Sequence, residues 1–283
     1  MNFHQTNLIH QPERLAESIR MIRSAGPDHF HVLADFDKTL TPAFAEGQKN
    51  MTIIAQLRNG QYLTPEYAPQ AQALFDHYAP LEKDPNLTLA ERKEKMHEWW
   101  VTHYQLLVKC GLNKATITQA IQESKMRFRE GIPKFFYFLH QHNIPLVIMS
   151  AAPGDMLLAH LVKANLLLSN VYAIGNLYDF DHEGNALKIR EPVIHSLNKS
   201  EIAIQGFPVY EEIKERKNVL LLGDSLGDIG MIEGFDYHEL IKIGFLNEND
   251  PAETKLYQEN FDIVITNDGT MDPINELLSD LFD

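Results

Sequence analysis

The chain has 283 residues, of which 44% are hydrophobic and 23% are charged. This composition is typical of a globular protein and excludes a collagen-like or wholly disordered chain. The 39 Asp and Glu residues outnumber the 25 Lys and Arg residues, which gives a formal net charge of −14. A surface this negative disfavours nucleic acid and anionic lipid as partners.

Three features of the sequence favour a cytoplasmic protein. No apolar run reaches the roughly 18–20 residues that a membrane helix needs, so we expect no membrane partner. The first residues lack the basic and apolar regions of a secretory signal. Cys110 is the single cysteine, so no intrachain disulfide can form, which fits a reducing compartment. We expect a soluble monomer or weak dimer.

Short apolar runs that end abruptly in polar or small residues recur along the chain. They cover residues 31–34, 144–149, 218–222, 241–245 and 263–265. Near-continuous Val, Ile and Leu runs of this length are typical of strands buried on both faces of a parallel sheet. Helical patterns lie between them, at residues 133–141, 154–165 and 199–217. The alternation predicts an α/β fold with a doubly wound parallel sheet, whose ligands bind at the carboxyl ends of the strands.

Residues 41–130 interrupt this alternation, because they contain no strong buried-strand run. Helical patterns occur there instead, at residues 65–78, 88–107 and 113–129. We therefore expect two domains. Residues 1–40 and 131–283 would form a catalytic α/β core, and residues 41–130 a helical cap that folds over the polar edge of the sheet and sets substrate specificity.

Two carboxylates follow the first apolar run. Asp35 and Asp37 are separated by one residue, so at the end of a strand they point the same way. Like charges this close need a shared cation or a protonated partner. The pair suits Mg²⁺, which prefers oxygen ligands, and it suits covalent catalysis in which one carboxylate attacks and the other handles a proton. A solvated acidic loop is the alternative if the pair stands alone.

A second acidic cluster, GDSLGD at residues 223–228, follows a later apolar run. Asp224 could bring a third carboxylate to a metal and Asp228 a fourth, although such segments also form ordinary turns and helix caps. The same letters contain G-x-S-x-G, the nucleophile elbow of serine hydrolases. A serine esterase would use Ser225, but His238, the only later histidine, follows too closely to be a good partner.

Two further residues are candidates for binding an anion. Ser150 ends the run at 144–149 and is followed by Ala151 in a predicted turn into a helix, where backbone N–H groups bind anions. Lys199 stands at the start of a predicted helix, where an ordinary surface lysine is the alternative. The acidic stretch at residues 179–184 resembles a calcium loop, but it lacks the final bidentate glutamate, so we predict a hairpin turn there.

Taken together, DFDKTLT at residues 35–41, Ser150, Lys199 and GDSLGD resemble the haloacid dehalogenase superfamily of phosphotransferases. The likeness is closest to the pyrimidine 5′-nucleotidase family, also called cytosolic 5′-nucleotidase type III. The segments that carry it are MHEWW at 96–100, SAAPGD at 150–155, IHSLNK at 194–199, LLGDSLGDIGM at 221–231 and IGFLN at 243–247. The resemblance implies a cytoplasmic, Mg²⁺-dependent enzyme that hydrolyses nucleoside 5′-monophosphates, with pyrimidine nucleotides as the expected substrates.

The resemblance also implies a role for each matching residue. Asp35 would be the nucleophile that takes the phosphoryl group as an aspartyl-phosphate, and Asp37 would protonate the leaving 5′-oxygen and then deprotonate water. Ser150, Ala151 and Lys199 would hold the phosphoryl oxygens. These roles agree with phosphoryl transfer in general, which depends on positioning and on stabilising the charge of the equatorial oxygens.

Further roles concern the metal and the base. Asp35, the backbone carbonyl of Asp37 and Asp224 would bind Mg²⁺, with Asp228 supporting the waters of the metal. In the cap, Glu98 would recognise the base, since a carboxylate accepts a hydrogen bond from an exocyclic amino group, and Ser124 would contact the substrate. Two alternatives stay open: a phosphatase of another small metabolite, such as a phosphoserine-like ester, and a catalytically silent binding protein.

Overall fold

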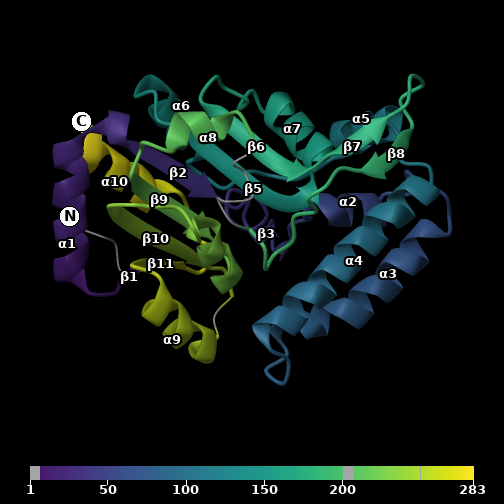
Figure 1. The fold of residues 1–283 in the computed structure, drawn as a ribbon, viewed down its shortest axis with the longest axis horizontal. Coiled ribbons are helices and arrows are strands. Elements are labelled where there is room, and N and C mark those ends of the chain that lie inside the picture. Colours follow the sequence, from purple (N-terminus) through teal and green to yellow (C-terminus); the bar gives the residue numbers. More distant parts are fainter. Residues whose placement is uncertain (1–6, 200–206, 249) are drawn as a thin grey trace.

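A seven-stranded sheet lies at the centre of the computed structural model, which describes residues 7–199, 207–248 and 250–283 (Figure 1). The strands are Asn7–Ile9 (β1), Phe30–Ala34 (β2), Leu146–Pro153 (β5), Val171–Asn176 (β6), Asn218–Gly223 (β9), Glu239–Leu246 (β10) and Ile263–Thr266 (β11). Their order is β1-β11-β10-β9-β2-β5-β6. All pairs are parallel except β1 with β11 at one edge. The doubly wound parallel sheet confirms the predicted fold class.

Helices cover both faces of this sheet. They are Pro12–Ala25 (α1), Ile132–Gln141 (α6), Gly154–Lys163 (α7), Val209–Ile213 (α8), Pro251–Asn260 (α9) and Asp272–Phe282 (α10). Successive strand residues point to opposite faces. In β9, Leu220 and Leu222 belong to the same buried cluster as residues of α1, α6, α7 and α10, whereas Val219 and Leu221 belong to a second cluster with residues of α8 and α9. Burial on both faces explains why each strand is an unbroken apolar run.

The segment between β2 and α6 is mainly helical. It contains Ile53–Asn59 (α2), Tyr67–Tyr78 (α3), Leu89–Lys109 (α4) and Lys114–Glu123 (α5), together with the small hairpin Phe44–Ala45 (β3) and Gln48–Lys49 (β4). Figure 1 shows α3 and α4 running side by side, away from the helices that cover the sheet. Helices α3, α4 and α5 fall within or near the three predicted helical patterns, whereas α2 was not predicted. The division of the chain into a core and a cap stays a prediction.

The structure differs from the predicted elements in two further places and agrees with the prediction in a third. Helix α5 ends at Glu123, several residues early, because the chain at 124–131 returns to the core without helical bonding. The pattern at 199–217 contains the short helix α8, and residues 200–206 lie outside the described residues. Tyr178–Phe180 (β7) and Ala186–Ile189 (β8) form the hairpin predicted around residues 179–184. No helix of the described residues is long and apolar enough to cross a membrane.

Candidate active site

Asp35 and Asp37 lie directly after β2, at the carboxyl edge of the sheet. The Asp35 N–H donates to the carbonyl oxygen of Leu222 in β9 at 3.0 Å, which extends the strand pairing by one residue. The Asp35 side chain is buried and accepts a weak hydrogen bond from the Thr39 hydroxyl at 3.4 Å. The half-buried Asp37 carboxylate accepts the N–H of Ile53, at the start of α2, at 3.2 Å. Hydrogen bonds therefore join Asp35 to β9 and Asp37 to the start of α2.

Lys199 is buried beside the same strand end. Its Nζ donates to Asp35 Oδ1 and, at 2.9 Å, to Asp228 Oδ1. All three side chains are less than one-tenth exposed. Burial lowers the pKa of Lys199, but the Asp228 and Asp35 carboxylates outweigh it and raise this pKa above its usual range. The ammonium therefore stays charged and is held between two carboxylates.

Asp228 also organises the loop after β9. Its Oδ2 accepts the N–H groups of Asp224 at 3.1 Å and Ser225 at 2.9 Å, and the Ser225 hydroxyl at 2.9 Å. Gly223 makes this turn possible, because a Cβ built there would lie 2.5 Å from the Cβ of Asp228. The loop places Asp224 toward Asp35, and oxygens of Asp35, Asp224 and Asp228 lie within 4.8 Å of one another.

The electrostatics of this acidic cluster favour a bound cation. Burial raises the pKa of Asp35 to about 6, although the charge of Lys199 lowers it, and Asp228 makes a smaller contribution that raises it. Burial and then the charge of Asp35 raise the pKa of Asp37 to about 7. Burial, Asp228 and Asp35 raise the pKa of Asp224 well above its usual value. A divalent cation among these oxygens relieves the repulsion, and carboxylate oxygens are the ligands that hard cations prefer.

The end of β5 forms another wall of the site. The buried Ser150 hydroxyl accepts the N–H of Ala152 at 3.1 Å. The carbonyl of Ala151 accepts hydrogen bonds from the Tyr104 hydroxyl of α4 and from Asn176 Nδ2, the latter at 2.9 Å. Asn176 also accepts the N–H of Ile194 at 2.7 Å. The turn at Ser150–Ala152 is thus tied to α4 and to the loop that leads to Lys199.

A cavity of about 580 Å³ joins these elements. From the core, it is lined by the predicted residues Asp35, Asp37, Ser150, Ala151, Lys199, Asp224 and Asp228. From the helical segment, Ile54, Lys83, Arg92 and Trp100 line it. The structure therefore brings four separated core segments to one cavity, with helical residues opposite them.

Two predicted residues do not line this cavity. Glu98 lies on an exposed face of α4, where its Oε2 accepts a hydrogen bond from Lys95 at 2.9 Å. Ser124 follows the end of α5, and its hydroxyl accepts the N–H of Met126 at 3.1 Å. Helical geometry explains the first case, because Glu98 is two residues before Trp100 and so points in another direction. The expected base and substrate contacts of Glu98 and Ser124 stay predictions.

The sequence analysis assigned no site role to Asn176 or Tyr257, and it did not predict the hydrogen bond that Tyr104 makes at the site. Tyr104, Asn176 and Tyr257 are buried, and each bonds to a loop that carries a predicted site residue. A buried tyrosine or asparagine looks like any core residue in a sequence. The one available signal was the mixture of aromatic residues at helical spacing in α4.

The esterase alternative fails on geometry. Ser225 follows the carboxyl end of β9, whereas His238 precedes β10, which runs parallel to β9 with Glu239 opposite Asn218. The two side chains therefore lie at opposite ends of strands, and six residues of strand span about 20 Å. The Ser225 hydroxyl instead donates to Asp228. Ser225 has no histidine partner in the described structure.

Comparisons with known proteins agree with the geometry. Residues 38–282 match the profile of the pyrimidine 5′-nucleotidase family (UMPH-1). The chain is 35% identical to the 7-methylguanosine phosphate-specific 5′-nucleotidase of Gallus gallus, over 95% of this chain and 94% of that protein. The crystal structure of cytosolic 5′-nucleotidase IIIB bound to cytidine superposes with a TM-score of 0.91 and 28% identity, over 99% of this chain and 94% of the other.

A more distant likeness concerns the fold alone. A phosphoserine phosphatase structure described as a phospho-aspartyl intermediate analogue has a TM-score of 0.51 and 17% identity, over 87% of this chain and 96% of the other. The predicted resemblance is confirmed, since the family profile and the nucleotidase likeness both span most of the residues. The chain belongs to the pyrimidine 5′-nucleotidase family, has the core fold of haloacid dehalogenase-type hydrolases, and is a 5′-nucleotidase.

Proposed function

We propose that this 5′-nucleotidase is a Mg²⁺-dependent phosphatase of nucleoside 5′-monophosphates that works through an aspartyl-phosphate. The observation that carries the proposal is the cluster at the floor of the cavity. Oxygens of Asp35, Asp224 and Asp228 lie within 4.8 Å of one another, and Lys199 contacts two of these carboxylates. In a protein of charge −14, a dianionic phosphate binds only where local cations override the overall field.

Mg²⁺ would be held by Asp35, Asp224 and the backbone carbonyl of Asp37, with Asp228 supporting its waters. When bound, the ion would neutralise charge on the phosphoryl oxygens. The donor set fits, because it consists of closely spaced carboxylate oxygens whose pKa values are raised mainly by burial, and a hard cation prefers such oxygen ligands. Every ligand in this proposal comes from the chain itself or from water.

Asp35 is the proposed nucleophile. Its Oδ atom attacks phosphorus, the bond from phosphorus to the 5′-oxygen breaks, and Asp37 gives its proton to that oxygen. Asp37 then takes a proton from the water that attacks the aspartyl-phosphate, which releases phosphate and restores Asp35. A pKa of about 7 suits Asp37 to both tasks, since an acid–base group works best near the operating pH. Lys199 and the Ser150–Ala151 turn hold the phosphoryl oxygens.

The helical residues opposite the cluster are the proposed source of specificity, which makes residues 41–130 the cap. Trp100 lines the cavity and offers a flat surface on which a base can stack. Pyrimidine nucleotides are the proposed preferred substrates. A 7-methylguanosine phosphate is the second candidate, because an aromatic face also attracts a cationic base. We place the enzyme in the cytoplasm, as a monomer or weak dimer.

The direct test is a phosphate-release screen over CMP, UMP, GMP, 7-methyl-GMP and phosphoserine, each with Mg²⁺ and with EDTA. We expect turnover of nucleoside monophosphates with Mg²⁺ and none with EDTA, and CMP or UMP as the best substrates. A preference for 7-methyl-GMP would favour the second candidate. Turnover confined to phosphoserine would overturn the nucleotide assignment, and turnover that survives EDTA would overturn the role of the metal.

A further inference from the structure

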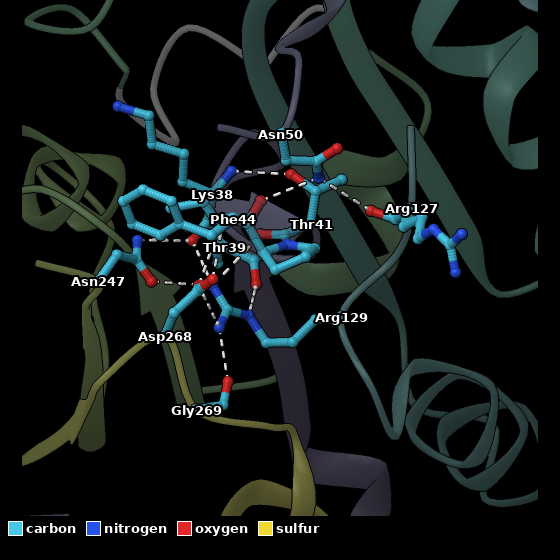
Figure 2. Close-up of polar contacts among 12 residues, drawn as sticks. Lys38, Thr39, Thr41, Phe44, Asn50, Arg127, Arg129, Asn247, Asp268 and Gly269 are labelled. Atoms are coloured by element: carbon cyan, nitrogen blue, oxygen red, sulfur yellow. Dashed lines mark hydrogen bonds and ion pairs between the residues drawn. The ribbon is translucent and has the colours of Figure 1, made fainter. Parts of the chain in front are cut away.

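Arg129 is a buried cation that lies outside the cavity. It follows α5, just before α6, and is 2% exposed. Figure 2 shows its guanidinium at the centre of a group of oxygen atoms that belong to three separate loops. It is absent from the residues that line the cavity, so we expect it to act through the residues that it contacts.

The first of these loops carries Asp35 and Asp37. The Arg129 guanidinium donates to the backbone carbonyls of Lys38 at 2.6 Å, Thr39 at 2.8 Å and Thr41 at 3.2 Å. Lys38 has a left-handed backbone, with φ at 64°, which few residues other than glycine adopt readily. Hydrogen bonds to its carbonyl therefore stabilise a turn that is intrinsically unfavourable, directly after the proposed acid–base residue.

The other two loops follow β10 and β11. Arg129 donates to Asn247 Oδ1 at 3.1 Å and to Asp268 Oδ1 at 3.0 Å, and its guanidinium lies 4.1 Å from the ring centroid of Phe245. Asn247 in turn donates to the same Lys38 carbonyl at 3.0 Å. The Lys38 carbonyl thus accepts hydrogen bonds from two side chains, those of Arg129 and Asn247.

The residues around Arg129 also bind both chain segments that connect the core to the helical segment. The outgoing chain is held by Asp268, whose two carboxylate oxygens accept the N–H groups of Ala43 and Phe44, each at 2.9 Å. The returning chain is held by the Arg129 N–H, which donates to the carbonyl of Leu40 at 2.9 Å. Figure 2 also shows Asn50, whose side chain bonds to the carbonyls of Pro42 and Arg127 at 2.9 Å and 3.3 Å.

Arginine is the side chain that this arrangement requires. Its five N–H donors spread in a plane and reach several acceptors at once, whereas the lysine ammonium is a compact group with three. Removing a donor leaves buried carbonyl oxygens without partners, which is unfavourable in the protein interior. A smaller or differently shaped cation would therefore let the loop at residues 38–41 move.

We propose that Arg129 is a positioning residue for phosphoryl transfer. It fixes the backbone at residues 38–41, so that Asp35 and Asp37 keep their places at the end of β2, and it fastens both linkers of the helical segment to that same loop. The inference rests on the proposed roles of Asp35 and Asp37. It predicts that loss of the Arg129 hydrogen bonds lowers kcat while KM for the phosphate ester stays nearly unchanged.

The test compares Arg129→Lys with Arg127→Lys, a matched control in the same irregular segment between α5 and α6. Arg127 is exposed and pairs with Glu46. Turnover of p-nitrophenyl phosphate and of CMP is measured with Mg²⁺, beside the unfolding temperature. We expect kcat to fall about 10²-fold in Arg129→Lys, because a displacement of about 1 Å costs this much, with KM within about twofold. Arg127→Lys should keep wild-type values.

Two further variants keep the test decisive if Arg129→Lys folds poorly. Asn247→Ala removes the second donor to the Lys38 carbonyl from a partly exposed position, and it should lower kcat several-fold with little change in unfolding temperature. Arg129→Ala should regain part of its kcat when guanidinium chloride is added at millimolar concentration, below denaturing levels. Arg127→Ala should show no such gain.

The proposal is overturned if folded Arg129→Lys keeps kcat within about twofold of the wild type or, where that variant does not fold, if Asn247→Ala does. It is also overturned if the loss of kcat only follows the loss of folded protein. Asp35→Asn separates this failure from a failure of the proposed function. Wild-type turnover of p-nitrophenyl phosphate by Asp35→Asn would refute the proposed chemistry, whereas an inactive Asp35→Asn beside a normal Arg129→Lys would refute the role of Arg129 alone.

Discussion

The two walls of the cavity are built differently. On the sheet side, Asp35, Lys199 and Asp228 are each less than one-tenth exposed and are bonded to one another. On the helical side, Lys83 bridges to Glu253 of α9 at 3.1 Å with 81% of its side chain exposed. An exposed ion pair contributes little to stability, whereas buried charges interact strongly and depend on their partners.

From this difference, we expect the two walls of the cavity to have different roles. The sheet side carries the groups that the proposed chemistry needs in fixed positions, and most of these groups follow the ends of strands. The helical side offers Trp100, Arg92 and Lys83 with few bonds to the core, so it can adapt to the substrate. We therefore expect substitutions on the sheet side to reduce turnover of every phosphate ester, and those on the helical side to change substrate preference.

The largest expected effect comes from Asp35→Asn. An amide cannot attack phosphorus, so we expect turnover to fall about 10³-fold or more, which corresponds to roughly 4 kcal/mol of transition-state stabilisation. Steady-state kinetics with CMP and p-nitrophenyl phosphate measure it. Asp179→Asn, on the exposed β7–β8 hairpin, is the control and should keep full activity. Equal activity of the two variants would contradict the catalytic assignment.

Lys199→Met should have the second-largest effect on activity. The variant leaves Asp35 and Asp228 without their shared cation, and it removes a proposed contact to the phosphoryl oxygens. We expect about a 10²-fold loss of kcat/KM on all esters, since one donor to the developing charge contributes about this much. Lys95→Met, which removes an exposed lysine of α4, should change kcat/KM little. A loss of kcat/KM seen only with nucleotides would indicate that Lys199 recognises the base and not the phosphate.

Trp100→Ala probes the helical wall. If the base stacks on this ring, kcat/KM for nucleoside monophosphates should fall about tenfold, since stacking contributes about 1–3 kcal/mol per base. Turnover of p-nitrophenyl phosphate should fall much less. Trp99→Ala is a poor control, because Trp99 is buried against Tyr78 and Met96 and its loss would disturb packing. Phe75→Ala, at an exposed residue of α3, serves better.

In the metal-free protein, the pH dependence of the free energy of unfolding should show the titration of Asp37. Folding raises its pKa from the usual 3.8 to about 7, so the folded state binds more protons than the unfolded state between these values. The wild type should therefore lose stability as pH rises from about 4 to 7, relative to Asp37→Asn. We expect a change of about 2 kcal/mol, because each pKa unit corresponds to about 1.4 kcal/mol and Asp37 is only half-buried.

Urea unfolding in EDTA at several pH values measures this difference. Asp181→Asn, which alters an exposed aspartate of a hairpin turn whose pKa is lowered by its hydrogen bonds, should show no such trend over the same range. A wild-type protein that gains stability over Asp37→Asn between pH 4 and 7 would contradict the raised pKa.

Glu98→Ala should have the smallest effect. Its carboxylate is half-exposed and pairs with Lys95, so its removal should change the unfolding temperature little, because exposed ion pairs contribute little to stability. From its position outside the cavity, we expect kcat/KM for CMP to change less than about twofold. A tenfold loss for CMP, with normal turnover of p-nitrophenyl phosphate, would instead show that Glu98 reaches the base during turnover, as the family resemblance implies.

The sequence was most informative where one physical rule governs many residues. Strands such as β9 are buried on both faces, so they are continuous apolar runs, and the polar residues after them must meet at one edge of a parallel sheet. This rule sufficed to place Asp35, Ser150 and Asp224 together. The contacts of Arg129 and Asn176 could not be predicted, because they join segments far apart in the chain through backbone carbonyls that have no sequence signal.

The formation of a phosphorylated Asp35 is the central claim, and it can be measured directly. The enzyme is mixed with CMP and Mg²⁺, quenched with acid within milliseconds, digested, and searched by mass spectrometry for a peptide carrying one phosphoryl group. We predict that the group lies on Asp35 and that Asp35→Asn carries none. A phosphoryl group on another residue of an active enzyme, or single-turnover release of phosphate with no phosphorylated peptide at any time, would contradict the claim.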